Sequence, residues 1–95
     1  MKGATLTGTT ATRFSPVRLA IYEKLLDRST AEWTVATLTE SLPSHIRRDS
    51  VRSTLYVLLA YDLMNQVRGH SALTVRLTPH GAAVLRPLVD AWRAR

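Results

Sequence analysis

From Ser15 onward, apolar residues recur along the chain at the spacing of a helix. The first such pattern has five members that share one face or its edge: Leu19, Ile21, Tyr22, Leu25 and Leu26. Ser15 is a good N-cap, and Pro16 fits the first helical position, where an N–H group is not needed. The pattern therefore predicts a helix over residues 15–28.

A shorter unit follows between residues 32 and 43. Glu32 and Trp33 can form a very short strand, and Thr34 can cap a helix that runs from Val35 to Leu42. The apolar residues Val35, Leu38 and Leu42 repeat at intervals of three and four, which buries one side of this helix. Pro43 ends it, because the residue before a proline is disfavoured in the α region.

The segment "SHIRRDSVRSTLYVLLAYDLM", residues 44–64, predicts a helix over about 49–63 after a tight turn. Asp49 is expected to cap it, and its charge suits the positive end of the helix. One side is aliphatic and must face a core: Val51, Leu55, Leu58 and Leu59. The opposite side carries Arg52, Ser53 and Tyr56, with Ser50 and Val57 on its flanks.

A hairpin and a last helix complete the pattern. Residues 65–68 and 73–78 can be strands, since Val75 and Leu77 alternate with polar residues, and Gly69-His70-Ser71 supplies the turn. Thr78 and Pro79 then start a helix over about 79–95. Its apolar face contains Val84, Leu85, Leu88, Val89 and Trp92. Pro87 lies inside this pattern and is expected to kink or split the helix.

The order of elements predicts the fold class. Helix, short strand, helix, tight turn, helix, hairpin and helix is the order of a winged helix-turn-helix, a mainly α protein with a small β-hairpin (α+β). Residues 1–14 are rich in threonine and glycine and lack periodicity, so we expect a flexible N-terminal arm. Residues 15–95 form one winged-helix domain, because 95 residues suffice for a single domain at most.

Composition narrows the function. The formal net charge is +6, and only Lys2 and Lys24 among the thirteen basic residues are lysines. Arginine forks fit phosphate oxygens and guanine edges, so double-stranded DNA is the first partner to consider. A soluble cationic surface without a nucleic-acid partner remains the alternative on composition alone.

Other classes of protein receive no support from the sequence. There is no cysteine, no glycine-rich phosphate loop and no evident nucleophile–base pair, so we expect no enzyme and no cofactor. The histidines, at positions 45, 70 and 80, lie in three separate segments, and no metal site is expected. No stretch is apolar enough to span a membrane and no secretory signal is visible, so the default location is the cytoplasm.

A helix-turn-helix inserts its second helix into the major groove of DNA, N-terminal residues first. The expected reading helix is therefore 49–63, with Ser50, Arg52, Ser53 and Tyr56 as contacts to bases or phosphates, and Arg47 and Arg48 as contacts to phosphates. The wing, residues 65–78, would contact the backbone or minor groove through Arg68, His70 and Arg76. The competing interpretations are an ordinary solvated helix face and a winged-helix protein-interaction module without sequence-specific DNA binding.

Three segments also resemble a known group of proteins. "TVATLTESL", "RRDSVRSTLYVLLAYDLM" and "VRLTPHGAAVLRPL" resemble the MarR/PadR/HxlR type of bacterial winged-helix regulators, over about residues 15–95. Asp62 stands where those proteins often carry a glycine before the wing. The resemblance implies sequence-specific DNA binding as a homodimer, usually as a repressor.

The helix at 79–95 is the candidate for dimerisation. Its expected interface consists of Val84, Leu85, Leu88, Val89 and Trp92, because a chain of this length has little core with which to cover them all. The chain lacks the additional helices that form a ligand pocket in MarR-type proteins. A small-molecule effector is therefore not expected.

Overall fold

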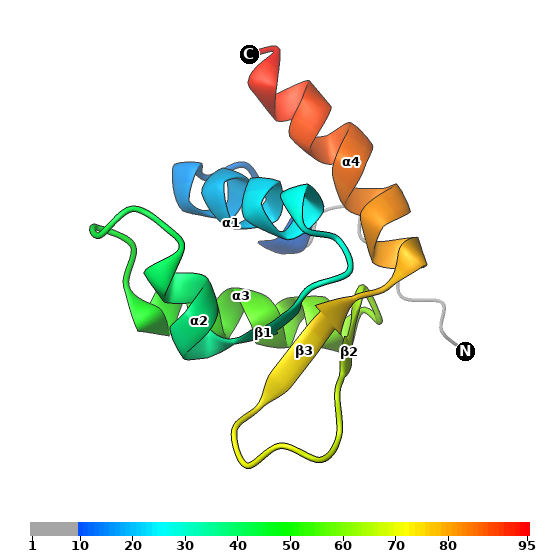
Figure 1. Ribbon diagram of the computed structural model, residues 1–95. Coiled ribbons are helices and arrows are strands. Elements are labelled where there is room, and N and C mark those ends of the chain that lie inside the picture. The colour runs from blue at the N-terminus through cyan, green and yellow to red at the C-terminus, as the bar shows by residue number, and fades with distance from the viewer. Residues whose placement is uncertain (1–9) are drawn as a thin grey trace.

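A computed structural model of the protein describes residues 10–95 (Figure 1). A 3-10 turn, η1 (Thr10–Thr12), precedes seven elements. The helices are α1 (Pro16–Asp27), α2 (Val35–Glu40), α3 (Arg48–Ala60) and α4 (Pro79–Arg93), and the strands are β1 (Glu32–Thr34), β2 (Met64–Gln66) and β3 (Thr74–Leu77). The elements follow one another in the predicted order, so the prediction of a winged helix-turn-helix is confirmed.

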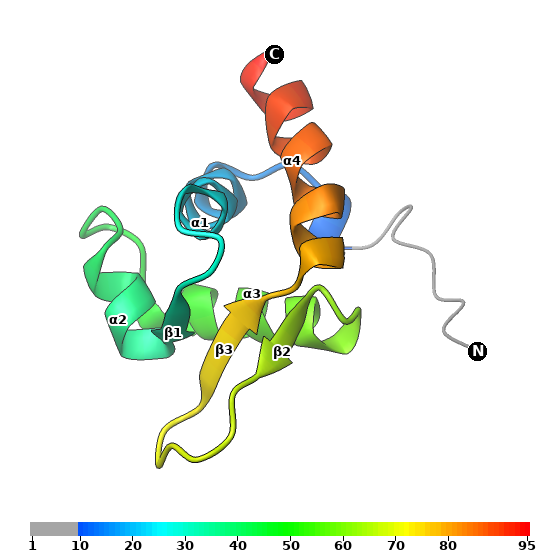
Figure 2. The ribbon, with the colours of Figure 1, turned by 45° about the vertical axis from the view of Figure 1, so that its right-hand side comes forward.

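The three strands form one antiparallel sheet in the order β1-β3-β2 (Figure 2). The short strand after α1 is thereby hydrogen-bonded to the second strand of the hairpin. Trp33 lies opposite Val75, and Glu32 lies opposite Arg76. On the other side of β3, Asn65 also lies opposite Arg76. Trp33 and Val75 are buried, so their row of side chains points into the core. Glu32, Arg76 and Asn65, in the next row, are exposed on the opposite face of the sheet.

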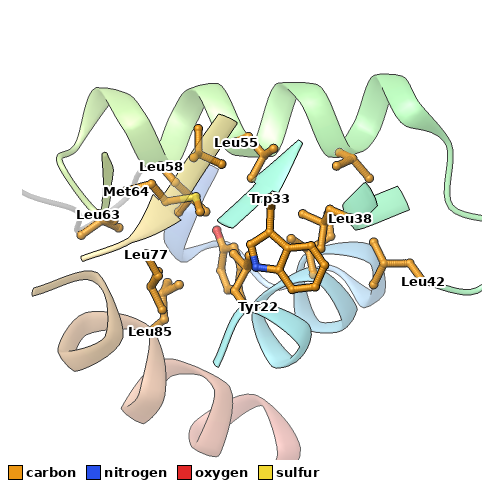
Figure 3. Packing of buried hydrophobic residues seen from close by; sticks show 14 of the residues in the cluster. Tyr22, Trp33, Leu38, Leu42, Leu55, Leu58, Leu63, Met64, Leu77 and Leu85 are labelled. Atoms are coloured by element: carbon orange, nitrogen blue, oxygen red, sulfur yellow. The ribbon is translucent and has the colours of Figure 1, made fainter. Parts of the chain in front are cut away.

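The core lies between α3 and the pair of helices α1 and α4. Figure 3 shows Tyr22 and Trp33 between α3 and α1, with Leu55 and Leu58 pointing inward from α3. Tyr22, Leu55 and Leu58 are completely buried. The aliphatic side of α3 therefore faces the core as predicted, and this fixes which side of α3 is exposed.

Ala11 and Phe14, which lie in the stretch that the sequence assigns to a flexible arm, pack onto this core. Ala11 is buried, and its carbonyl oxygen accepts a hydrogen bond of 2.9 Å from the hydroxyl of Tyr22. Phe14 meets Trp92 edge-on, with 5.5 Å between the ring centroids, and the guanidinium of Arg95 lies 4.5 Å above the Phe14 ring. The Phe14 ring is partly buried against the core although the surrounding sequence has no helical or strand periodicity. Residues 1–9 of the expected arm lie outside the described residues.

Three of the four predicted helix caps are confirmed. Ser15, Thr34 and Thr78 each accept a hydrogen bond from the backbone of their helix's first turn. The fourth prediction is wrong, because α3 begins at Arg48 and its N-cap position is Arg47, which makes no side-chain capping bond. Asp49 lies inside the first turn. Helix α2 also ends at Glu40, two residues earlier than expected.

Helix α3 ends at Ala60 rather than near 63, and Asp62 explains how. Its φ of 61° is left-handed, the conformation that glycine usually supplies after a helix. The N–H of Leu63 donates to the carbonyl of Leu58 at 2.9 Å, and the N–H of Asp62 donates to that of Leu59 at 3.1 Å. These two bonds form a Schellman motif. Asp62 therefore adopts the conformation of the missing glycine.

Hydrogen bonds join the start of α4 to Leu63, the last residue of this motif. The backbone N–H of Thr78 donates to the carbonyl oxygen of Leu63 at 3.0 Å, and the Thr78 hydroxyl approaches the same oxygen at 3.1 Å. Gly81 faces that carbonyl so closely that an added Cβ would overlap its oxygen and lie 2.8 Å from its carbon. The glycine of the "LTPHG" segment is therefore required by a close approach of two backbones.

Helix α4 runs through Pro87 without interruption, so the expected split does not occur. Its apolar residues divide between two faces. Leu85, Val89 and Trp92 are buried in the core of the chain itself, and Trp92 stacks on Tyr22 with 5.6 Å between ring centroids. Val84 and Leu88 are only partly buried. The sequence pattern assigned all five residues to a single apolar face, because the buried face and the partly buried face are adjacent on the helix.

Candidate nucleic-acid interface

The exposed side of α3 carries the residues expected to read DNA. Arg52, Ser53 and Tyr56 are exposed, and Tyr56, at 54%, is the one exposed large hydrophobic residue in the described part of the chain. An aromatic ring that is this accessible on a helix offers both an apolar face and a hydroxyl to a partner. Ser50 is partly buried beside this stripe. The structure thus brings the four side chains onto one accessible stretch of α3.

Positive charge gathers where α3 begins. Arg47 and Arg48 are both exposed, and no side chain caps the helix there. An uncapped N-terminus presents backbone N–H groups and a positive dipole end, which favour anions such as phosphate. Asp49 reduces this charge, since its carboxylate lies 3.3 Å from the Nη1 of Arg52. Both side chains are mostly exposed, so this pair is weak and Arg52 can exchange Asp49 for another acceptor.

The wing consists of β2, β3 and the loop between them, in which Gly69 has a φ of 93°. Figures 1 and 2 show this hairpin extending away from α1 and α4 beside α3. Arg68 is exposed and makes no ion pair with any described residue. It is therefore available to an external anion.

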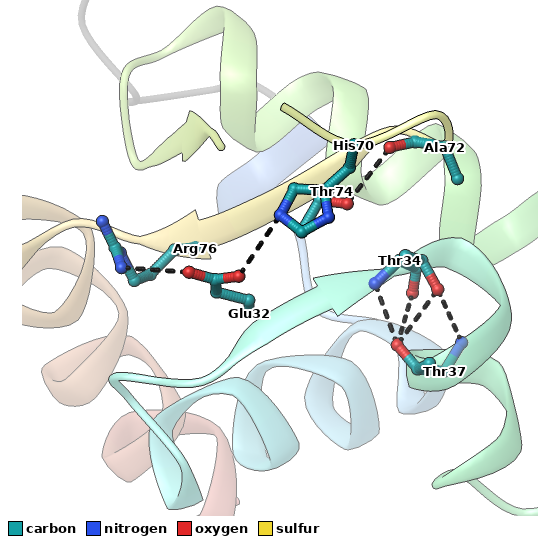
Figure 4. Close-up of polar contacts among 7 residues, drawn as sticks. All are labelled: Glu32, Thr34, Thr37, His70, Ala72, Thr74 and Arg76. Carbon is teal, nitrogen blue, oxygen red and sulfur yellow. Dashed lines mark hydrogen bonds and ion pairs between the residues drawn. The ribbon is translucent and has the colours of Figure 1, made fainter. Parts of the chain in front are cut away.

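The other two wing residues share one carboxylate (Figure 4). The Nη1 of Arg76 lies 3.4 Å from one oxygen of Glu32, and the Nε2 of His70 lies 3.7 Å from the other. Glu32 was missed by the sequence reasoning, which treated it only as part of a short strand. The single signal that could have identified it is the strand register, which no local pattern reveals.

Within residues 10–95, no cluster of three or more potential metal ligands is present. No helix in that part of the chain has the length and apolar character needed to cross a bilayer.

An open groove lies away from the exposed side of α3, between α1, the residues that follow α2, and α4. Its volume is about 680 Å³, and both acidic and basic side chains line it. Glu23 and Arg93 form a 2.7 Å ion pair across it. This groove contains none of the residues that the sequence analysis assigned to DNA or to a dimer interface except Val89, which is buried.

The fold and the arginine-bearing surface define a winged helix-turn-helix domain. No known family model and no curated protein matches the sequence. Among solved structures, the chain is similar to a crystal structure described as a possible transcriptional regulator for arsenical resistance. The TM-score is 0.57 at 28% sequence identity, over 82% of this chain and 76% of that one.

Proposed function

We propose that this protein is a transcriptional regulator that binds double-stranded DNA sequence-specifically. The observation that carries the proposal is the division of α3 into two sides. Val51, Leu55 and Leu58 are completely buried on the aliphatic side, and Arg52, Ser53 and Tyr56 are exposed on the other. The core holds the helix rigidly, so its polar side can be presented to a major groove. The similarity to a possible transcriptional regulator supports the same conclusion.

We assign the following roles to the side chains on this surface. Arg52 donates to a guanine edge, while Ser53, Tyr56 and Ser50 contact neighbouring bases or phosphates. Arg47 and Arg48 hold phosphates at the N-terminus of α3. The wing contacts the backbone or the minor groove through Arg68, His70 and Arg76.

The reading role of Arg52 is tested by comparing two arginine variants. We expect Arg52→Ala to weaken binding to a selected genomic site by about 1–3 kcal/mol and to relax preference at one base position. Arg86→Ala is the matched control, because Arg86 is an exposed arginine on α4 without an ion pair among the described residues. Fluorescence anisotropy with the selected and a random duplex measures both. Equal losses on the two duplexes would show that Arg52 contacts only phosphate.

We further propose that α4 pairs with α4 of a second copy, through a narrower face than the sequence suggested. With Leu85, Val89 and Trp92 in the chain's own core, the outward apolar stripe consists of Val84 and Leu88, flanked by the exposed Ala83, Pro87 and Ala91. A two-fold pair would place two reading helices about 34 Å apart, one turn of DNA, and so predicts a near-palindromic site.

Sedimentation at micromolar concentration tests the pairing. The wild type should sediment as a dimer, and Leu88→Glu should give folded monomers that bind a half-site weakly. Arg86→Glu, a charge change on another side of the same helix, should leave the dimer intact. A monomeric wild type that binds an asymmetric site tightly would exclude the pairing, and would leave the stripe to a different protein.

Repression is the regulatory direction we propose, since a dimer bound across a promoter blocks polymerase without any additional activating surface. Transcription in vitro from a promoter that overlaps the selected site should fall as protein is added. A rise in transcript would show an activator instead.

A further inference from the structure

One carboxylate controls the charge of the wing's exposed face. Glu32 enters the sheet on β1, far from the hairpin in sequence, and the strand register sets it directly opposite Arg76. Directly opposite residues in an antiparallel pair have neighbouring side chains. The guanidinium and the carboxylate are accordingly 3.4 Å apart, and His70 approaches the second carboxylate oxygen at 3.7 Å.

The arrangement resembles the way a DNA phosphate would be held. A phosphate and a carboxylate both accept hydrogen bonds from an arginine fork, so they compete for the same donor. The side chains of Glu32 and Arg76 are 42% and 51% exposed, which leaves their pair accessible to solvent and weak. A weak pair can open when a phosphate arrives, but its carboxylate stays nearby and repels that phosphate.

Arg68 provides the contrast within the same hairpin. It has no carboxylate partner among the described residues, whereas Arg76 and His70 share Glu32. Two of the three wing residues assigned to DNA therefore face an internal anion, and one does not.

We propose that Glu32 masks Arg76 and thereby limits the sequence-independent affinity of the wing for DNA. The inference rests on the proposed DNA-binding function and adds a residue that opposes it. Glu32 itself contacts no DNA. It acts by occupying the guanidinium that would otherwise neutralise a backbone phosphate.

The experiment measures binding of a random duplex against salt concentration, with Glu32→Gln and Asp27→Asn as matched variants. Both remove one negative charge, but Asp27 lies at the end of α1 and makes no ion pair with a described residue. All titrations are carried out at one pH, and the Arg76→Ala background shows whether Arg76 is the cation responsible.

We expect Glu32→Gln to bind the random duplex roughly two- to fivefold more tightly at low salt, the range for an exposed ion pair. The slope of log K against log salt should steepen by about 0.9, the effect of one additional phosphate neutralised. Asp27→Asn should show a smaller gain and an unchanged slope. In an Arg76→Ala background, Glu32→Gln should give no more than the gain of Asp27→Asn and no change in slope, because the masked cation is gone.

Three results separate the possible failures. A wild type without salt-sensitive binding to duplex DNA would overturn the proposed function itself. A wild type that binds, together with a Glu32→Gln variant that matches Asp27→Asn, would overturn only the masking role. A gain above that of Asp27→Asn that persists in the Arg76→Ala background would also overturn it, since the effect would then not depend on Arg76. Circular dichroism and melting confirm that each exposed substitution leaves the fold intact.

Discussion

Replacing Gly81 by alanine sets two physical effects against each other. Alanine is the better helix former, and at an ordinary helical position the change would stabilise the protein by about 1 kcal/mol. At Gly81, however, the new Cβ would overlap the carbonyl oxygen of Leu63 and lie 2.8 Å from its carbon, where ordinary contacts begin near 3.4 Å. Both neighbours are backbone atoms, so no side chain can rotate away to make room.

The magnitude follows from what must move. The first turn of α4 has to retreat from the carbonyl of Leu63 by roughly one ångström or more. Its bonds to that carbonyl come from the N–H and hydroxyl of Thr78, at 3.0 and 3.1 Å. Losing both costs about 1 kcal/mol each, and residual strain adds about 1–3 kcal/mol. After the gain in helix propensity, the net loss is about 2–4 kcal/mol.

Thermal unfolding followed by circular dichroism measures this loss. For a domain of this size it corresponds to a fall in Tm of roughly 10–30 °C. Ala83→Gly is the control, because Ala83 is exposed on the same helix and should lose only the propensity term, about 0.5–1 kcal/mol. A Gly81→Ala protein that melts at or above the wild-type temperature would refute the close-approach argument.

Two other changes probe stability. Asp62→Gly should be more stable than Asp62→Ala by about 1 kcal/mol in urea denaturation, because both lack the carboxylate and only glycine adopts the left-handed φ without strain; equal midpoints would contradict this. Burial raises the pKa of Tyr22 to about 12, against a smaller opposing effect of Arg18. In the unfolded chain the Tyr22 hydroxyl ionises near its usual pKa of 10. The stability that its protonated form contributes to the folded chain is therefore fully present below pH 10 and is lost as the pH rises towards 12. The wild type should lose roughly 1 kcal/mol more than Tyr22→Phe between pH 9 and pH 11, and parallel losses would show that Tyr22 does not titrate this way.

Local sequence was sufficient for the elements and for their polarity. Apolar spacing located α1, α3 and α4, and the caps at Ser15, Thr34 and Thr78 were confirmed. These features depend on interactions within a few residues, which a linear pattern contains. The burial of α3's aliphatic side was predictable for the same reason, since a helix fixes which residues share a face.

Other features depend on segments that are distant in the chain. Phe14 lies in a stretch without periodicity, and its ring contacts Trp92 and Arg95, which lie far away in the sequence. The sequence pattern does not distinguish the two apolar flanks of α4. In the structure Trp92 stacks on Tyr22, so the flank that carries Trp92 faces the core. No local pattern distinguishes these cases, because the energy comes from partners that the fold supplies.

The wing shows most directly what a local sequence pattern cannot predict. The sequence identified Arg76 as a cation on an alternating strand, and this depends only on the period of two. Its pairing with Glu32 depends on β1 joining β3 in one register, across 44 residues of chain. A slip of one residue would move Glu32 to the opposite face of the sheet and leave Arg76 without its carboxylate. The sequence by itself therefore determined that the wing is basic, and only the tertiary structure decided which of its cations faces an internal anion.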